Sequence, residues 1–361
     1  MLPYYLLLGI PFAVSLLTGF STFPLRRKTH AVFDSFFLIW LFLLFFRAER
    51  VGCDLPVYKY HFFNYAQFSL GQILVGAFSG EFELGYALIV KLISCITANF
   101  RFVMIVCALI AVLPVWKFYR NEQHPALLII LFVNIAPFSM YFSGLRQAMA
   151  MAFTCLALHY CRQKDFLRFV LVVFAAFLFH RSALIMLLMY PVYHFKLKKK
   201  VHLLFILPFI GFIYVFNKPI FRFLLLFMQG KYYDRYAEGV HSTGAYSVLL
   251  LLAVLLVFTY LLPDQCMLDP DTIGLRNILT LAVLLQTFAG VHSLAMRMNY
   301  YYLLLVPLAI SHVIDRSEKN QRLAKISILC MTVFFFVYFF YHAYTSSDIL
   351  NIFPYVSVFH T

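Results

Sequence analysis

Three basic side chains stand out because each lies at the polar end of an apolar stretch, and one carboxylate stands out in a polar loop. Arg146 opens one such stretch, His180 closes the next, Arg297 opens a later one, and Asp54 lies in a polar loop. A guanidinium is a planar fork that matches phosphate oxygens, and a histidine or a carboxylate accepts a proton from a hydroxyl group. These residue types suggest binding of an anionic substrate together with a proton transfer.

The elements that must position Arg146 and His180 are two apolar helices within residues 143–184, joined by the basic turn at 162–164. Each helix is about long enough to cross the hydrocarbon core of a bilayer. An antiparallel pair of this kind brings Arg146 and His180 to the same membrane face. Polar and charged groups are costly there, so they indicate a functional site.

Each candidate also has a structural interpretation. Arg146 is also consistent with an arginine that snorkels to lipid phosphates, and His180 with a satisfied structural group. Asp54 is also consistent with an ordinary turn residue that caps the following helix. The tyrosines beside Arg297 are typical of a membrane-interface belt.

Composition defines the class of protein. The 361 residues are 63% hydrophobic and only 12% charged, against about 25% charged in soluble domains. Apolar runs recur along the whole chain, so we expect an all-α, polytopic helical membrane bundle that forms a single domain over 1–361. The net charge of +14 lies in short loops and indicates positive-inside topology, which we favour over nucleic-acid binding. The cysteines show no disulfide framework and no metal-ligand spacing.

Hydropathy predicts about 13 to 14 membrane segments. They lie near 3–20, 31–46, 84–98, 101–116, 125–141, 146–161, 166–180, 183–195, 201–217, 246–262, 274–290, 298–314 and 326–344. The basic loops at 26–28, 162–164, 196–200 and 316–325 should be cytoplasmic. Arg146, His180, Arg297 and the loops near 47–60 and 218–245 then face outward.

This topology contains one conflict of parity. Counting back from Arg146 through three spans places Glu81 and Glu83 inside, whereas counting forward from 26–28 places Asp54 outside. An additional crossing at 61–78 would resolve the conflict; if that stretch is instead an interfacial helix, one of the later predicted hairpins is wrong. For Glu81, Glu83 and Lys91 we favour an interhelical ion pair.

Further polar and aromatic residues near these helix ends are candidates for substrate binding. They are Arg50, Tyr58, Gln147, Tyr233, Arg235 and Tyr301. Arg297 and Tyr301 are spaced to share one helix face. No phosphate-binding loop, dinucleotide fingerprint, zinc-protease motif or serine-hydrolase elbow appears in its required context. We therefore expect no nucleotide, no cofactor and no metal.

Several motifs, taken in order, resemble those of the EpsG family. They are Arg50-x-Gly52-x-Asp54-x3-Tyr58, Glu83-x-Gly85-Tyr86, Gly144-Leu145-Arg146-Gln147-x-Met149-Ala150, Phe179-His180-x-Ser182-Ala183-Leu184, Arg297-x2-Tyr300 and Pro354-Tyr355. The resemblance spans nearly the whole chain, and Arg181 is a bulky departure within it. Members of this family are bacterial inner-membrane proteins of exopolysaccharide and O-antigen synthesis, related in role to Wzy-type polymerases.

The resemblance implies a metal-independent glycosyltransferase of GT-C-like architecture. It would move a growing glycan from undecaprenyl diphosphate onto a lipid-linked repeat unit, on the periplasmic or external side of the inner membrane. Its partners would be the lipid-linked oligosaccharide, membrane lipid and a chain-length regulator. The alternative is a flippase or export protein for the same lipid-linked oligosaccharide, and a third class is a structural subunit of an export assembly.

The sequence favours one division of roles among the catalytic candidates. Arg146, His180 and Arg297 would line an outer cavity, with Arg146 as the diphosphate clamp and His180 as a hydrogen-bond donor to phosphate. Asp54 is predicted to be the base, because it comes from a separate loop and could approach the acceptor from another direction.

Overall fold

The computed structural model describes residues 1–135, 137–196, 199–225, 244–261, 269–315, 321–345 and 350–360. Within these residues the regular structure is helical, apart from one isolated bridge between Arg47 and Ser357. The all-α, polytopic membrane class is confirmed. The chain divides into two compact units, unit 1 (1–184 and 327–361) and unit 2 (185–326), which are described separately below. The single-domain organisation stays a prediction.

Unit 1 contains ten α-helices in its described residues, followed by helix α20. They are α1 (Leu2–Gly19), α2 (Leu25–Phe46), α3 (Leu55–Gln67), α4 (Leu70–Phe78), α5 (Leu84–Ser94), α6 (Phe100–Tyr119), α7 (Pro125–Asn134), α8 (Met140–Ser143), α9 (Leu145–Arg162) and α10 (Phe166–Phe179), with α20 (Gln321–Thr345) beginning just before the unit boundary. A 3₁₀ segment, Arg181–Leu188, follows α10 and leads into unit 2.

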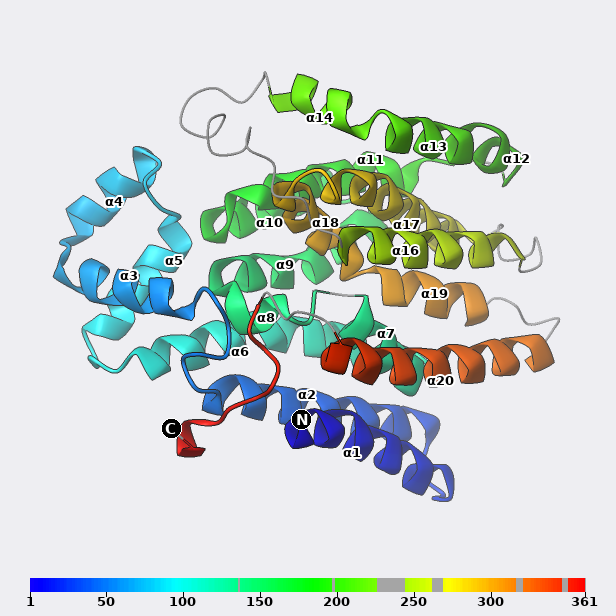
Figure 1. Ribbon diagram of the computed structural model, residues 1–361, viewed down its shortest axis with the longest axis horizontal. Helices are drawn as coiled ribbons and strands as arrows, with labels where there is room; N and C mark the ends of the chain where they lie inside the picture. The colour runs from blue at the N-terminus through cyan, green and yellow to red at the C-terminus, as the bar shows by residue number, and fades with distance from the viewer. Residues whose placement is uncertain are drawn as a thin grey trace. The chain divides into compact units, whose positions relative to one another are not determined.

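The predicted hairpin of two helices is confirmed as α9 and α10, which pack against each other. Its turn is stabilised where Asp165 caps α10, accepting a hydrogen bond from the Arg168 backbone N–H at 3.0 Å. Helix α9 also packs on α6, and α6 on α2, whereas the short helices α3, α4 and α5 gather at one end of unit 1 (Figure 1). We name this end the Arg47 end, after the residue that follows α2.

The predicted crossing at 84–98 is wrong. Helix α5 has 11 residues, so it is about 16 Å long, roughly half the hydrocarbon thickness. Immediately before it, Glu83 contacts Arg146 at the start of α9. Shortly after it, Arg101 donates to the carbonyls of Phe45 and Arg47 at 2.9 and 3.1 Å.

Both ends of α5 therefore lie at the Arg47 end, because the Arg47 guanidinium is 5.6 Å from the Phe142 ring, just ahead of α9. This removes the parity conflict without a crossing at 61–78. That stretch forms the end of α3 and all of α4, separated by a break where Ser69 and Gln72 make a capping box.

Among the described residues, fewer helices are long and apolar enough to cross a membrane than hydropathy predicts. In the described part of the chain, five helices are long and apolar enough to cross a membrane: α1, α2, α6, α17 and α20. A sixth candidate is the stretch 199–215 with 217–223, which is bent by 78°. The predicted span 298–314 is broken into two helices at 304–305.

Unit 2 is organised around α17. Its helices are α11 (Met189–His194), α12 (Lys199–Val201), α13 (Leu207–Val215), α14 (Asn217–Leu225), α16 (Gly244–Leu261), α17 (Pro270–Ala289), α18 (Ser293–Leu303) and α19 (Val306–Asp315), with a π-helical turn at His202–Ile206. Buried His202 bridges the Tyr260 hydroxyl at 2.6 Å and the Asn277 side-chain oxygen at 3.1 Å. This hydrogen-bond network fixes the π-turn against α16 and α17.

Residues 350–360 bind the loop that leads from α2 to α3. The Ala48 N–H donates to the Val356 carbonyl at 2.8 Å, and the Gly52 and Cys53 N–H groups donate to the carbonyls of Asn351 and Leu350. At φ +118° Gly52 has left-handed backbone geometry, and a Cβ there would lie 2.1 Å from the Phe142 carbonyl oxygen. Glycine at 52 is therefore required by both backbone and space.

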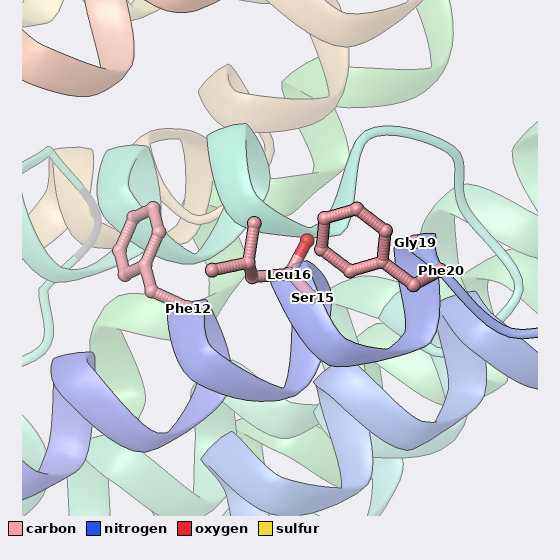
Figure 2. A pocket seen from close by; sticks show the side chains of 5 residues that line it. All are labelled: Phe12, Ser15, Leu16, Gly19 and Phe20. Carbon is pink, nitrogen blue, oxygen red and sulfur yellow. The ribbon is translucent and has the colours of Figure 1, made fainter.

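A shallow pocket lies on the exposed face of α1, between Phe12, Ser15, Leu16, Gly19 and Phe20 (Figure 2). Its lining is apolar except for one hydroxyl, and α1 is one of the membrane-spanning candidates. Among its lining residues only Ser15 carries a polar side chain, so the pocket offers no acid–base pair for catalysis.

Candidate functional site

Glu83 joins the two residues that the sequence singled out. The Arg146 guanidinium donates from Nη1 to Glu83 Oε2, and the His180 Nδ1 lies 3.3 Å from Glu83 Oε1. The three side chains are 29%, 18% and 10% exposed for Arg146, His180 and Glu83, respectively. The carboxylate is thus the most buried of the three, and the arginine is the one that solvent or a ligand reaches most easily.

The close approach of α5 to α10 brings Glu83 to this position. Glu83 is the residue before α5, and His180 is the residue after α10. A Cβ on Gly85 would lie 3.0 Å from the Leu178 carbonyl oxygen and 3.2 Å from the Phe179 ring. A larger residue at position 85 would require the end of α10 to move by a few tenths of an ångström, so glycine favours this close packing.

Arg181 holds the preceding loop in place. Its guanidinium donates to the Gly80 carbonyl at 2.6 Å, and Gly80 has a left-handed φ of +81°. The bulky departure from the family motif therefore contacts the loop that carries Glu83. Arg181 thus stabilises the loop before α5. The sequence had not predicted a structural role for this side chain.

Helix α3 contributes an aromatic ring that packs against Arg146. The Tyr58 ring lies 5.5 Å from the Arg146 Cζ atom, a cation–π contact. Burial raises the pKa of the Tyr58 hydroxyl even though Arg146 opposes that shift, so it stays protonated. One turn further along, burial and then the charge of Arg146 lower the pKa of His61.

The electrostatics keep Glu83 ionised. Burial raises the pKa of its carboxyl, but the hydrogen bond from His180 and the charge of Arg146 outweigh burial and lower the pKa to about 2. Glu83 is thus a fixed negative charge at neutral pH. Because an ionised carboxylate only accepts hydrogen bonds, the contact with His180 requires a proton on Nδ1.

A backbone hydrogen bond holds Asp54 next to the chain that leads into α9, the helix that carries Arg146. It stands at the N-cap position of α3, one turn before Tyr58, but its side chain makes no capping hydrogen bond. The Asp54 N–H donates to the Ser143 hydroxyl at 3.1 Å, which ties the loop to α8 at the start of α9. The half-buried Asp54 carboxylate lies 3.7 Å from the Cys53 sulfur.

The other candidates differ in accessibility. Arg50 is exposed in the same loop, whereas Gln147 is only 1% exposed. In unit 2, Arg297 is exposed on α18, but Tyr301 is fully buried. The shared helix face of Arg297 and Tyr301 and the substrate-binding role of Tyr301 stay predictions. Tyr233 and Arg235 lie outside the described residues.

Glu83 is the functional candidate that sequence analysis did not assign to the site. The favoured interhelical ion pair is present, but its partners are Arg146 and His180, and Lys91 instead donates to the Ala66 carbonyl at 2.8 Å. The signal was the motif Glu83-x-Gly85-Tyr86. Its glycine marks the close helix approach that brings the carboxylate to the hairpin.

Helical architecture and a polar cluster at helix ends define a polytopic membrane protein with a candidate site for an anionic substrate. The profile of the EpsG family matches residues 30–357, and the chain belongs to this family. Membership indicates a membrane protein of the polysaccharide-polymerase kind. Comparison with curated proteins and with solved structures finds no match, so the GT-C-like architecture stays a prediction.

Proposed function

We propose that this protein is a bacterial inner-membrane polysaccharide polymerase. It transfers a growing glycan from undecaprenyl diphosphate to a hydroxyl group of a second lipid-linked repeat unit, on the outer side of the membrane. The observation that carries the proposal is the cluster of Arg146, His180 and Glu83 at one end of unit 1. Family membership supports the substrate class.

The reaction needs a cation where negative charge develops. As the bond between the sugar C1 and the diphosphate oxygen breaks, its electron pair moves to the diphosphate. Arg146 is suited to this role because its guanidinium is partly exposed and rests on the Tyr58 ring. A guanidinium fork binds two phosphate oxygens at once, which an ammonium group does not do.

The reaction also needs an acceptor for the proton of the attacking hydroxyl. His180 and Asp54 are the two candidates: His180 shares Glu83 with Arg146, and the Asp54 backbone N–H donates to Ser143, which precedes α9. The lipid-linked donor already carries its leaving group, the undecaprenyl diphosphate. The chemistry assigned to these side chains therefore requires neither a nucleotide nor a cofactor.

Surface-polysaccharide ladders test the function. In a deletion strain, loss of long chains with single repeat units retained supports a polymerase. Loss of all surface repeats supports the flippase instead, and unaffected chain synthesis contradicts both. Complementation by Arg146→Lys should restore membrane insertion but few long chains. Normal ladders from both Arg146→Lys and Arg146→Ala would show that Arg146 only anchors the protein to lipid.

A further inference from the structure

We infer that Glu83 is a positioning residue that makes His180 the base of the transfer reaction. This inference rests on the proposed function. It assigns a role to a residue that touches His180 and Arg146 directly and is expected to reach the substrate only through them.

The position of the proton on the imidazole ring follows from the charge of Glu83. Glu83 is ionised, because His180 and Arg146 hold its carboxyl in the charged form. The His180 Nδ1 atom lies 3.3 Å from Glu83 Oε1, so Nδ1 is the nitrogen that carries the hydrogen. The hydrogen bond made by one ring nitrogen determines the state of the other. In the neutral ring Nε2 is therefore left with a lone pair.

The same carboxylate also stabilises the product of proton transfer. When the acceptor oxygen forms its bond to the sugar C1, its proton moves to Nε2 and His180 becomes a cation. Glu83 already faces the Nδ1 side of that cation. The proton then leaves to solvent, which restores the neutral ring with the same tautomer.

The two carboxylate oxygens of Glu83 contact different residues. Its second oxygen accepts the Arg146 Nη1 hydrogen bond, so the clamp for the leaving diphosphate and the base for the acceptor share one fixed anchor. Gly85 sets the distance of this anchor from the end of α10. Preorganisation of this kind holds reacting groups in place before substrate arrives.

The first test measures the tautomer and does not depend on turnover. Protein labelled with ¹⁵N-histidine is examined in lipid by solid-state NMR, about two pH units above the unperturbed histidine pKa of about 6.5. Subtracting the spectrum of His180→Gln identifies the His180 signals. The wild type should carry Nδ1–H with a bare Nε2, and Glu83→Ala should shift His180 toward Nε2–H. A wild-type ring with Nε2–H overturns the inference, even when Glu83→Ala does not accumulate.

The second test measures transfer with purified protein and a lipid-linked repeat unit. Glu83→Gln should lower kcat by about 100-fold while KM changes by less than about three-fold, and Glu83→Asp should recover part of kcat. Glu81→Gln is the matched control, because Glu81 is exposed two residues away, and it should behave as the wild type. Full kcat in Glu83→Gln overturns the inference. An inactive wild type contradicts the proposed function instead and leaves the NMR result to decide the tautomer.

Discussion

Glu83 should make the stability of unit 1 depend on acid, and the structure gives the size of the effect. The carboxyl pKa falls from 4.5 to about 2 in the folded protein, a difference of about 2.5 pH units. At about 1.4 kcal/mol per unit, the contacts of Glu83 stabilise the folded state by roughly 3.5 kcal/mol at neutral pH. Because the lower pKa belongs to the folded state, this stabilisation is complete above about pH 5 and disappears as the pH falls toward 2.

Thermal unfolding of the wild type and Glu83→Gln in lipid nanodiscs measures this contribution. The protein has two tryptophans, Trp40 and Trp116, and both lie in unit 1, so their fluorescence reports on the unit that carries the site. For a domain of 150–250 residues, 1 kcal/mol shifts Tm by about 2–4 °C. The variant should therefore unfold roughly 7–14 °C below the wild type at about pH 7.

The pH series provides the sharper result. As the wild-type carboxyl becomes protonated, the difference in Tm should shrink, and at about pH 2–3 the two proteins should nearly coincide. Glu81→Gln should unfold with the wild type throughout, because that side chain is exposed. An equal Tm difference at every pH would show that the substitution acts through packing, and the electrostatic reasoning would fail.

Three further predictions concern the neighbouring residues. His180→Gln should abolish chain growth by the purified enzyme, whereas Asp54→Asn should retain measurable transfer; the reverse result would restore Asp54, which the sequence alone favoured, as the base. Gly85→Ala should lower the free energy of unfolding by about 1–3 kcal/mol through overpacking and lower kcat several-fold, because its Cβ would lie 3.0 Å from the Leu178 carbonyl oxygen. A wild-type kcat would show that α5 can shift without disturbing Glu83. Tyr58→Phe should keep most of the affinity for lipid-linked donor and Tyr58→Leu should lose more, because only the former keeps the ring beneath Arg146; equal losses would assign the role to the hydroxyl.

The hairpin could be predicted from sequence because its signal is local. Two apolar runs of suitable length with a basic turn between them suffice to place Arg146 and His180 at the same end. The structure confirms this arrangement, since both side chains contact one carboxylate. The residue types at the helix ends also predicted the binding of an anionic substrate.

The role of Glu83 could not be predicted in the same way. Its partners lie 63 and 97 residues away in the chain, and hydropathy carries no information about such contacts. The apolar run after Glu83 has the composition of a membrane span, but α5 is only 11 residues long. Counting it as a crossing separated Glu83 from Arg146, although the two side chains are in contact. The burial of Tyr301 was missed for a related reason, because helical spacing alone does not show which side of a helix is covered.

The contact between residues 350–360 and the loop from α2 to α3 has a consequence for the order of folding during synthesis. The loop emerges early, yet the carbonyls that bind Ala48, Gly52 and Cys53 are about 300 residues further along, and all of unit 2 is translated in between. Contacts this distant form late, because the loop closure must precede them. Until then, the segment that leads to Asp54 and Tyr58 lacks its final partners. The loop that leads to Asp54 and Tyr58 would therefore reach its final packing only after residues 350–356 had been synthesised.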